Sequence, residues 1–356
     1  MADLLSRFII ALFSKAAATI FVLLFSLAAT YFPTSYTDDL IKTITASLVL
    51  STILRLGSDN LVLNDVRNNS ESTLPTAQFA FSIILLVVCV PLVFYLFEGN
   101  ALKVLSVSLA LSVSASLSNL FIGKGQLIIG VLLRGVGPYL IFLVGVLMQP
   151  FYEIDISSLI IIYLVFIFLS FNYVAKFNLP AFNIGCFWSD IRVLFQPYLV
   201  VVAVSNALLS NILIFYSSVG VLNLNLTDAN LVQRLGNAGS ALSNIVFWSC
   251  PSLAHKDLWK KFIALPALVL STTFLIPDYI IIDNYVAICI LVIVLYQLSV
   301  GLCRVYDLEG RHYGFLALDH LLNLGFLGLS LLVFDLHTSF LVTCAVLLFL
   351  RKYHPT

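Results

Sequence analysis

Four basic side chains lie inside long apolar stretches of this 356-residue chain, where the local sequence offers little to balance their charge. They are Lys15, Arg55, Arg134 and Arg234. A charged side chain near the centre of a bilayer costs about 2.5 to 3.5 kcal/mol on insertion scales, so each one needs a compensating partner. Four cations with few anions beside them predict a cavity that binds negative charge.

Arg134 has the least local compensation of the four. It lies within the apolar stretch 127–148 and has no acidic residue within four positions along the chain. Its partner must therefore come from another helix, from water or from a ligand. Four neighbours favour close helix approach or a local break in backbone hydrogen bonding: Gly130, Gly135, Gly137 and Pro138. We interpret Arg134 as an anion-binding residue, with an interhelical ion pair as the alternative.

Arg55 and Lys15 have structural interpretations as well. Arg55 and Asp59 are four residues apart, so both side chains lie on one face of a helix and can form an ion pair. Lys15 lies near the expected cytoplasmic end of its helix, and its ammonium can extend to the inner headgroups. Both residues therefore stay candidates either for the cavity or for anchoring their helices.

Asparagines follow one face of the helix expected at 229–250, and more polar residues lie on the helix expected at 197–219. Such a face is too polar to contact lipid. Amides in membranes can join helices, at about 1 kcal/mol for each hydrogen bond, or they can line a cavity that accepts sugars. We favour the cavity, and the candidate sugar-facing residues are Asn206, Ser210, Asn230, Asn237 and Asn244.

Asp59, Asp319 and His320 are candidates for coupling transport to H⁺ or Na⁺, because ionisable residues within membrane helices often carry protons. An interfacial position is the alternative for Asp319 and His320. The six cysteines are scattered singly, with no histidine at ligand spacing, so no metal site and no cofactor are expected. The serines of 101–122 are assigned to tight helix packing rather than to chemistry.

The composition predicts an all-α, polytopic membrane protein. The chain is 61% hydrophobic and only 10% charged, with a mean hydropathy of +1.05, which excludes a soluble globular domain. Because one crossing needs roughly 20 apolar residues, about twelve transmembrane helices are expected. We place them at 8–31, 40–63, 77–97, 101–122, 127–148, 157–175, 197–219, 229–250, 258–276, 285–303, 313–333 and 335–350.

The distribution of Lys and Arg predicts the orientation. With the N-terminus in the cytoplasm, most basic loop residues fall on the cytoplasmic side, and only Lys42 and Lys103 fall outside. Both termini are therefore expected in the cytoplasm. The longest connection suggests a division into a six-helix lobe at 1–178, an interfacial linker at 179–196 and a second six-helix lobe at 197–356. Such a division is common among secondary transporters.

Three short motifs occur in order along the chain. The first is Arg55-Leu56-Gly57-Ser58-Asp59-Asn60, the second is the segment from Asp190 to Pro197, and the third runs from Arg234 to Pro251-Ser252-Leu253. Within twelve helices, this order resembles the polysaccharide and O-antigen flippases of the multidrug/oligosaccharidyl-lipid/polysaccharide exporter superfamily. The resemblance covers most of the chain, although members of that family are typically longer.

The resemblance implies a transporter rather than an enzyme. It would move an undecaprenyl-pyrophosphate-linked oligosaccharide, such as an O-antigen unit for lipopolysaccharide, from the cytoplasmic to the periplasmic leaflet of the bacterial inner membrane. Its partners would be the lipid-linked glycan, the lipid bilayer and a polysaccharide polymerase with other assembly proteins, and no nucleic acid is expected. Cationic residues line a central cavity in this family, and Lys15, Arg55, Arg134 and Arg234 are the candidates here.

Two alternatives stay open. A membrane-embedded polymerase or glycosyltransferase could use Asp38 and Asp39, which fall in the first expected outer loop, but a loop of about eight residues is short for a catalytic surface. A small-molecule antiporter of the same superfamily would favour buried acidic residues in the N-terminal half. The clearly buried charges are basic, which favours the flippase.

Overall fold

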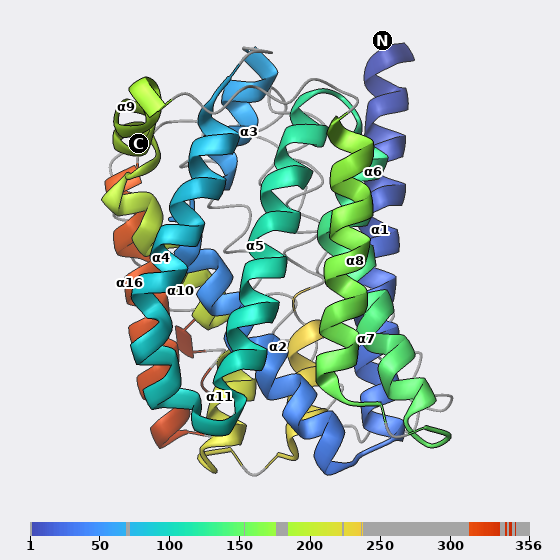
Figure 1. Cartoon of the computed structure of the whole chain (residues 1–356). Coiled ribbons are helices and arrows are strands. Elements are labelled where there is room, and N and C mark those ends of the chain that lie inside the picture. Colours follow the sequence, from blue (N-terminus) through green and yellow to red (C-terminus); the bar gives the residue numbers. More distant parts are fainter. Residues whose placement is uncertain are drawn as a thin grey trace. The chain divides into compact units, whose positions relative to one another are not determined.

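The structure is a computed structural model, and it describes residues 2–68, 72–152, 154–175, 184–222, 224–235, 237, 313–334, 339, 342–343 and 346. Within these ranges the chain is helical with short connections and contains no strand (Figure 1). The helices expected at 258–276 and 285–303 lie outside the described residues. Most residues of the helices expected at 229–250 and 335–350 also lie outside the described residues.

The described helices follow most of the expected spans in the first half of the chain, apart from the one expected at 40–63. In order they are α1 (Ala2–Tyr31), α2 (Ser35–Leu54), α3 (Asp59–Asn68), α4 (Leu74–Phe97), α5 (Ala101–Gly123), α6 (Leu127–Val131), α7 (Gly137–Met148) and α8 (Ile156–Ala175). The 3-10 turn Glu98–Asn100 links α4 to α5, and the π-helical turn Leu132–Val136 links α6 to α7.

After α8 the described helices are α9 (Ile184–Leu194), α10 (Pro197–Leu209), α11 (Ile212–Ser218) and α16 (Tyr313–Val333), and residues 226–235 are also helical. The segment 179–196, expected as a linker, therefore contains a helix, α9. Its Asp190 accepts a hydrogen bond from the Thr73 hydroxyl at 2.7 Å. A bend of 61° then separates α9 from α10.

Apolar helices of membrane-spanning length are present in the described residues. Two segments, Leu74–Gly123 and Ile128–Met148, are long and apolar enough to cross a membrane, and α9 with α10 makes a third if that bent pair is one span. The first segment contains α4 and α5, which lie side by side in Figure 1. Each exceeds 20 residues, enough for a crossing of its own. The total of twelve spans stays a prediction.

The chain forms two compact units. One unit is Phe13–Ala207, and the other combines Met1–Leu12 with Leu208–Thr356. The expected six-helix lobes at 1–178 and 197–356 stay a prediction. The two units are described separately below.

Helix α5 is the centre of the unit Phe13–Ala207, where it packs against α2, α3, α4, α6 and α8. Its serines allow this close approach because they are small and donate hydrogen bonds to neighbouring backbones. The Ser118 hydroxyl donates to the Gly130 carbonyl at 2.7 Å, and Ser114 donates to the Leu133 carbonyl. The assignment of these serines to helix packing is confirmed.

The single helix expected at 40–63 was wrong, because the chain breaks it at residues 55–58. Leu56 and Gly57 have φ angles of 54° and 63°, in the left-handed region. At Gly57 a Cβ atom would lie 2.2 Å from the Ala203 Cβ and 2.8 Å from the Leu199 carbonyl oxygen, so α10 packs directly on this turn. The residues from Arg55 to Asn60 are mostly polar, and this interruption of the apolar stretch was the local signal of the break.

A second break interrupts the helix expected at 197–219. Helix α10 ends at Leu209 and α11 begins at Ile212. Discontinuous helices of this kind leave backbone groups without helical partners, and transporters use them to form binding sites. Both breaks lie next to the arginines that the sequence singled out.

The predicted disturbance near Arg134 is confirmed. The Gly137 N–H donates to the Leu132 carbonyl, which is the i to i−5 bond of a π turn. Pro138 has no N–H to donate to the Arg134 carbonyl, which accounts for the irregular turn at this point. A Cβ on Gly135 would lie 2.5 Å from the Ala18 Cβ, so the predicted close helix approach is also present. Such π turns frequently occur at functional sites.

Candidate anion-binding sites

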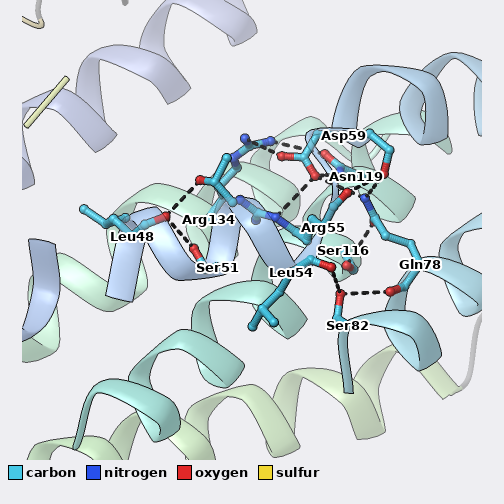
Figure 2. Close-up of polar contacts among 12 residues, drawn as sticks. Leu48, Ser51, Leu54, Arg55, Asp59, Gln78, Ser82, Ser116, Asn119 and Arg134 are labelled. Carbon is cyan, nitrogen blue, oxygen red and sulfur yellow. Dashed lines mark hydrogen bonds and ion pairs between the residues drawn. The ribbon is translucent and has the colours of Figure 1, made fainter. Parts of the chain in front are cut away.

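Asp59 lies between the two arginines of the N-terminal unit (Figure 2). Its Oδ2 accepts a hydrogen bond from Arg134 Nη2 at 3.0 Å. Its Oδ1 lies 3.5 Å from Arg55 Nε, which is an ion pair without hydrogen-bond geometry. The partner of Arg134 is thus an acidic residue 75 positions away, on a different helix. The predicted Arg55–Asp59 pair is confirmed as well.

Buried amides complete the surroundings of Asp59. Asn119 Nδ2 donates to Asp59 Oδ1 at 3.1 Å, while Asn119 Oδ1 accepts from Arg134 Nη1 at 3.2 Å. Gln78 Nε2 donates to the Ser58 hydroxyl at 2.8 Å and lies 3.4 Å from Asp59 Oδ1. Asn119 therefore bridges the carboxylate and the guanidinium, and this holds both in one orientation.

The break at 55–58 positions these charges. Arg55 is the C-cap residue of α2, and Asp59 is the first residue of α3. A cation at a helix C-terminus and an anion at a helix N-terminus both interact favourably with the helix dipoles. The break therefore brings two opposite charges together at two helix ends that favour them.

The cluster keeps an excess of positive charge. Arg55, Asp59 and Arg134 together carry a formal charge of one positive unit. Their side chains are 8%, 16% and 36% exposed respectively, so Arg134 is the most exposed side chain of the cluster. A cluster with a net positive charge, in which Arg134 is the most accessible side chain, can attract an anionic group.

The second unit holds a different arginine site. Arg234 is buried, with 7% of its surface exposed. Its Nη2 donates to Asn211 Oδ1 at 3.0 Å, and its Nε lies 3.3 Å from Asn230 Oδ1. In the part of the chain that the structure describes, no acidic residue pairs with Arg234. Neutral amide oxygens orient this guanidinium without cancelling its charge.

The amides next to Arg234 also satisfy the backbone at the break between α10 and α11. The Leu213 N–H, at the start of α11, donates to Gln233 Oε1 at 3.1 Å. Asn237 Nδ2 donates to the Ser210 carbonyl at 3.0 Å, and Gln233 Nε2 donates to Asn237 Oδ1 at 3.1 Å. Among the predicted sugar-facing residues, Asn237 therefore forms hydrogen bonds that stabilise this break, and Ser210 contributes its backbone carbonyl.

The remaining candidates are placed only in part. Asn206 is half-buried in α10 and belongs to the unit Phe13–Ala207, whereas Asn230 and Asn237 belong to the other unit. His320 is buried in α16. The side chains of Lys15, Asp319 and Asn244 lie outside what the structure describes. Their predicted roles stay predictions.

Asp38 and Asp39 do not lie in a loop, as the sequence suggested, but in α2, which begins at Ser35. The capping box of Thr34 and Thr37 fixes this earlier start. The connection from α1 is only the residues 32–34. The two carboxylates thus belong to the first turns of a helix.

No site role was assigned from the sequence to Gln78, Asn119 or Asn211, and Ser58 was noted only as part of a motif. The helix at 101–122 received no chemical role, yet its Asn119 contacts both Asp59 and Arg134. A single amide in a helix that is otherwise apolar or rich in serine is the signal that could have identified Gln78 and Asn119. Asn211 gave no such signal, because its role depends on the break beside it.

No family model matches this chain, and no curated protein matches it.

Proposed function

We propose that this protein is a flippase for an anionic, lipid-linked oligosaccharide, with undecaprenyl pyrophosphate as the lipid carrier and a bacterial inner membrane as its location. The observation that carries the proposal is Arg234, a buried cation that only amide oxygens contact among the described residues. Burying a charge without a counter-ion is costly, so such a residue is kept in a membrane protein for an anionic ligand.

The cluster at Asp59 supports the same ligand class. Its net charge is positive, and its most exposed side chain is that of Arg134. Guanidinium groups bind phosphate oxygens in a bidentate manner, which suits a pyrophosphate. The amides and hydroxyls near both arginines can replace the hydration of a sugar.

Transport of a small cation is the less suitable alternative. A cation antiporter needs carboxylates that are open to the transported ion. Asp59 is the acid of the cluster, and each of its carboxylate oxygens already faces an arginine. A membrane-embedded transferase stays an alternative, which now depends on two carboxylates of α2 rather than on a loop.

The discontinuous helices support an alternating-access mechanism. Broken helices can change direction at a few residues, and the breaks at 55–58 and 210–211 each adjoin a residue that contacts a candidate arginine. The lipid tail would remain in the bilayer while the head group passes from one leaflet to the other. No covalent step is needed.

The test is a translocation assay in proteoliposomes. The substrate is an undecaprenyl-pyrophosphate-linked oligosaccharide with a fluorescent sugar, and a membrane-impermeant quencher reports its leaflet. The variants Arg134→Gln and Arg234→Gln each remove one charged hydrogen-bond donor to the phosphates, worth roughly 1.5 to 3 kcal/mol. At saturating protein and low substrate, the initial rate is expected to fall about tenfold or more.

Arg192→Gln is the matched control, because Arg192 is an exposed arginine at the end of α9. This variant is expected to translocate the substrate at the wild-type rate. Wild-type rates in both Arg134→Gln and Arg234→Gln, with correct insertion, would refute the assignment of these arginines to the substrate.

A further inference from the structure

Asp59 is bound unequally by its two carboxylate oxygens. Within the described residues, Oδ1 has three neighbours that carry N–H groups, namely Arg55, Asn119 and Gln78. Oδ2 has one, which is Arg134. The contact between Asp59 and Arg134 is therefore the one that can be exchanged without leaving the carboxylate alone.

After the loss of this single contact, Asp59 would still have a counter-ion within the protein. Asp59 would still face Arg55, its neighbour across the break at 55–58, and the two would form a neutral pair. Arg134 would keep the Asn119 amide oxygen at 3.2 Å and would present its Nη2 to a new anion. The exposed fractions of the side chains agree with these roles. Arg134, which would meet the new anion, is 36% exposed, and Arg55, which would stay with Asp59, is 8% exposed.

We propose that Asp59 is the resident anion of Arg134, and that the phosphate of the transported head group displaces its Oδ2 from the guanidinium. The inference depends on the proposed function and names the residue that sets its specificity. An incoming anion must compete with a carboxylate that is already in position. A weakly bound monoanion cannot do this, whereas a pyrophosphate offers several charged oxygens to the same guanidinium.

The exchange also explains how a tightly bound head group can leave. When the phosphate dissociates, Asp59 recaptures Arg134, so the empty site returns to a paired state. Arg234 has no such resident anion among the described residues, since its partners are the amides of Asn211 and Asn230. The two arginine sites are thus expected to respond differently to the removal of Asp59.

The experiment measures binding of inorganic pyrophosphate to the purified full-length protein by isothermal titration calorimetry. Asp59→Asn removes the competing charge and keeps the size of the side chain. The dissociation constant is expected to fall about tenfold or more, and the added change Arg134→Gln is expected to abolish this gain. Asp59→Glu keeps the resident charge, so it is expected to bind no more tightly than the wild type.

A second variant separates competition from net charge and avoids an unpaired Arg55. In Arg55→Gln with Asp59→Asn, the cluster keeps the formal charge of the wild type, because one cation and one anion are both removed. If displacement of Asp59 limits binding, this double variant still binds pyrophosphate about tenfold more tightly than the wild type. If net charge alone decides, its affinity equals that of the wild type and the inference is wrong.

The failure of the inference differs from the failure of the proposed function. If Arg134→Gln abolishes pyrophosphate binding, and neither Asp59→Asn nor the double variant Arg55→Gln with Asp59→Asn binds more tightly than the wild type, the function stands and Asp59 is not a competitor. If neither the wild type nor any variant binds pyrophosphate, both the proposed function and the inference are overturned.

Discussion

Substitution of Gly57 tests the turn that brings Arg55 and Asp59 together. Gly57 has a φ of 63°, and a Cβ there would lie 2.2 Å from the Ala203 Cβ and 2.8 Å from the Leu199 carbonyl oxygen. Gly57→Ala therefore introduces two costs. Left-handed backbone costs a residue with a Cβ roughly 1 to 2 kcal/mol, and overpacking costs roughly 1 to 3 kcal/mol more.

Gly125→Ala is the matched control for the backbone term. Gly125 has a φ of 82°, also in the left-handed region, but a Cβ there meets nothing within 4 Å. Its substitution is expected to cost only the backbone term. The difference between the two variants thus isolates the contact of the turn with α10, expected at about 1 to 3 kcal/mol.

The assay is thermal unfolding of the purified variants in one detergent. Gly57→Ala is expected to lower the apparent Tm at least about 2 °C more than Gly125→Ala does, by the usual relation between stability and Tm in large domains. It is also expected to weaken pyrophosphate binding, because the turn sets the distance between Arg55 and Asp59. Equal Tm values for the two variants would refute the close packing of this turn on α10.

Two further predictions concern other contacts. Gln233→Leu removes the acceptor of the Leu213 N–H at the start of α11. A buried N–H without a partner costs about 1 to 3 kcal/mol, so the Tm is expected to fall, and an unchanged Tm would contradict the role of Gln233 at the break. Thr73→Val removes the hydroxyl that donates to Asp190. Limited proteolysis is expected to cut the connection between α3 and α4 faster in this variant, because the hydrogen bond that ties Thr73 to α9 is lost. An unchanged cleavage rate would contradict the role of this hydrogen bond in holding the connection.

Much of the described helical framework could be predicted from the sequence, because long apolar stretches determine it. The stretches expected at 77–97 and 101–122 correspond to α4 and α5 within a few residues. The spacing of Arg55 and Asp59 likewise predicted their pair, although the two residues meet across the break at 55–58 and not on one helix face. Gly135, Gly137 and Pro138 predicted the irregular turn at Arg134 for a similar local reason.

The rest depends on contacts between distant residues. The pairing of Arg134 with Asp59 joins residues 75 positions apart, and hydropathy carries no information about it. The close approach of Ala203 to Gly57 is likewise a contact that no local pattern near residue 57 reveals. In the same way, Asn119 looked like one more small polar residue of a packing helix, until its position between two charges was known.

The most direct test of the central claim compares two head groups in the translocation assay. One substrate carries the oligosaccharide on a pyrophosphate-linked lipid, and the other carries the same oligosaccharide on an uncharged lipid of equal length. The two arginine sites predict that the wild type moves the pyrophosphate substrate and not the uncharged one, and that Arg234→Gln removes this preference. Equal rates for both substrates in the wild type would contradict the claim that Arg134 and Arg234 bind the anionic head group.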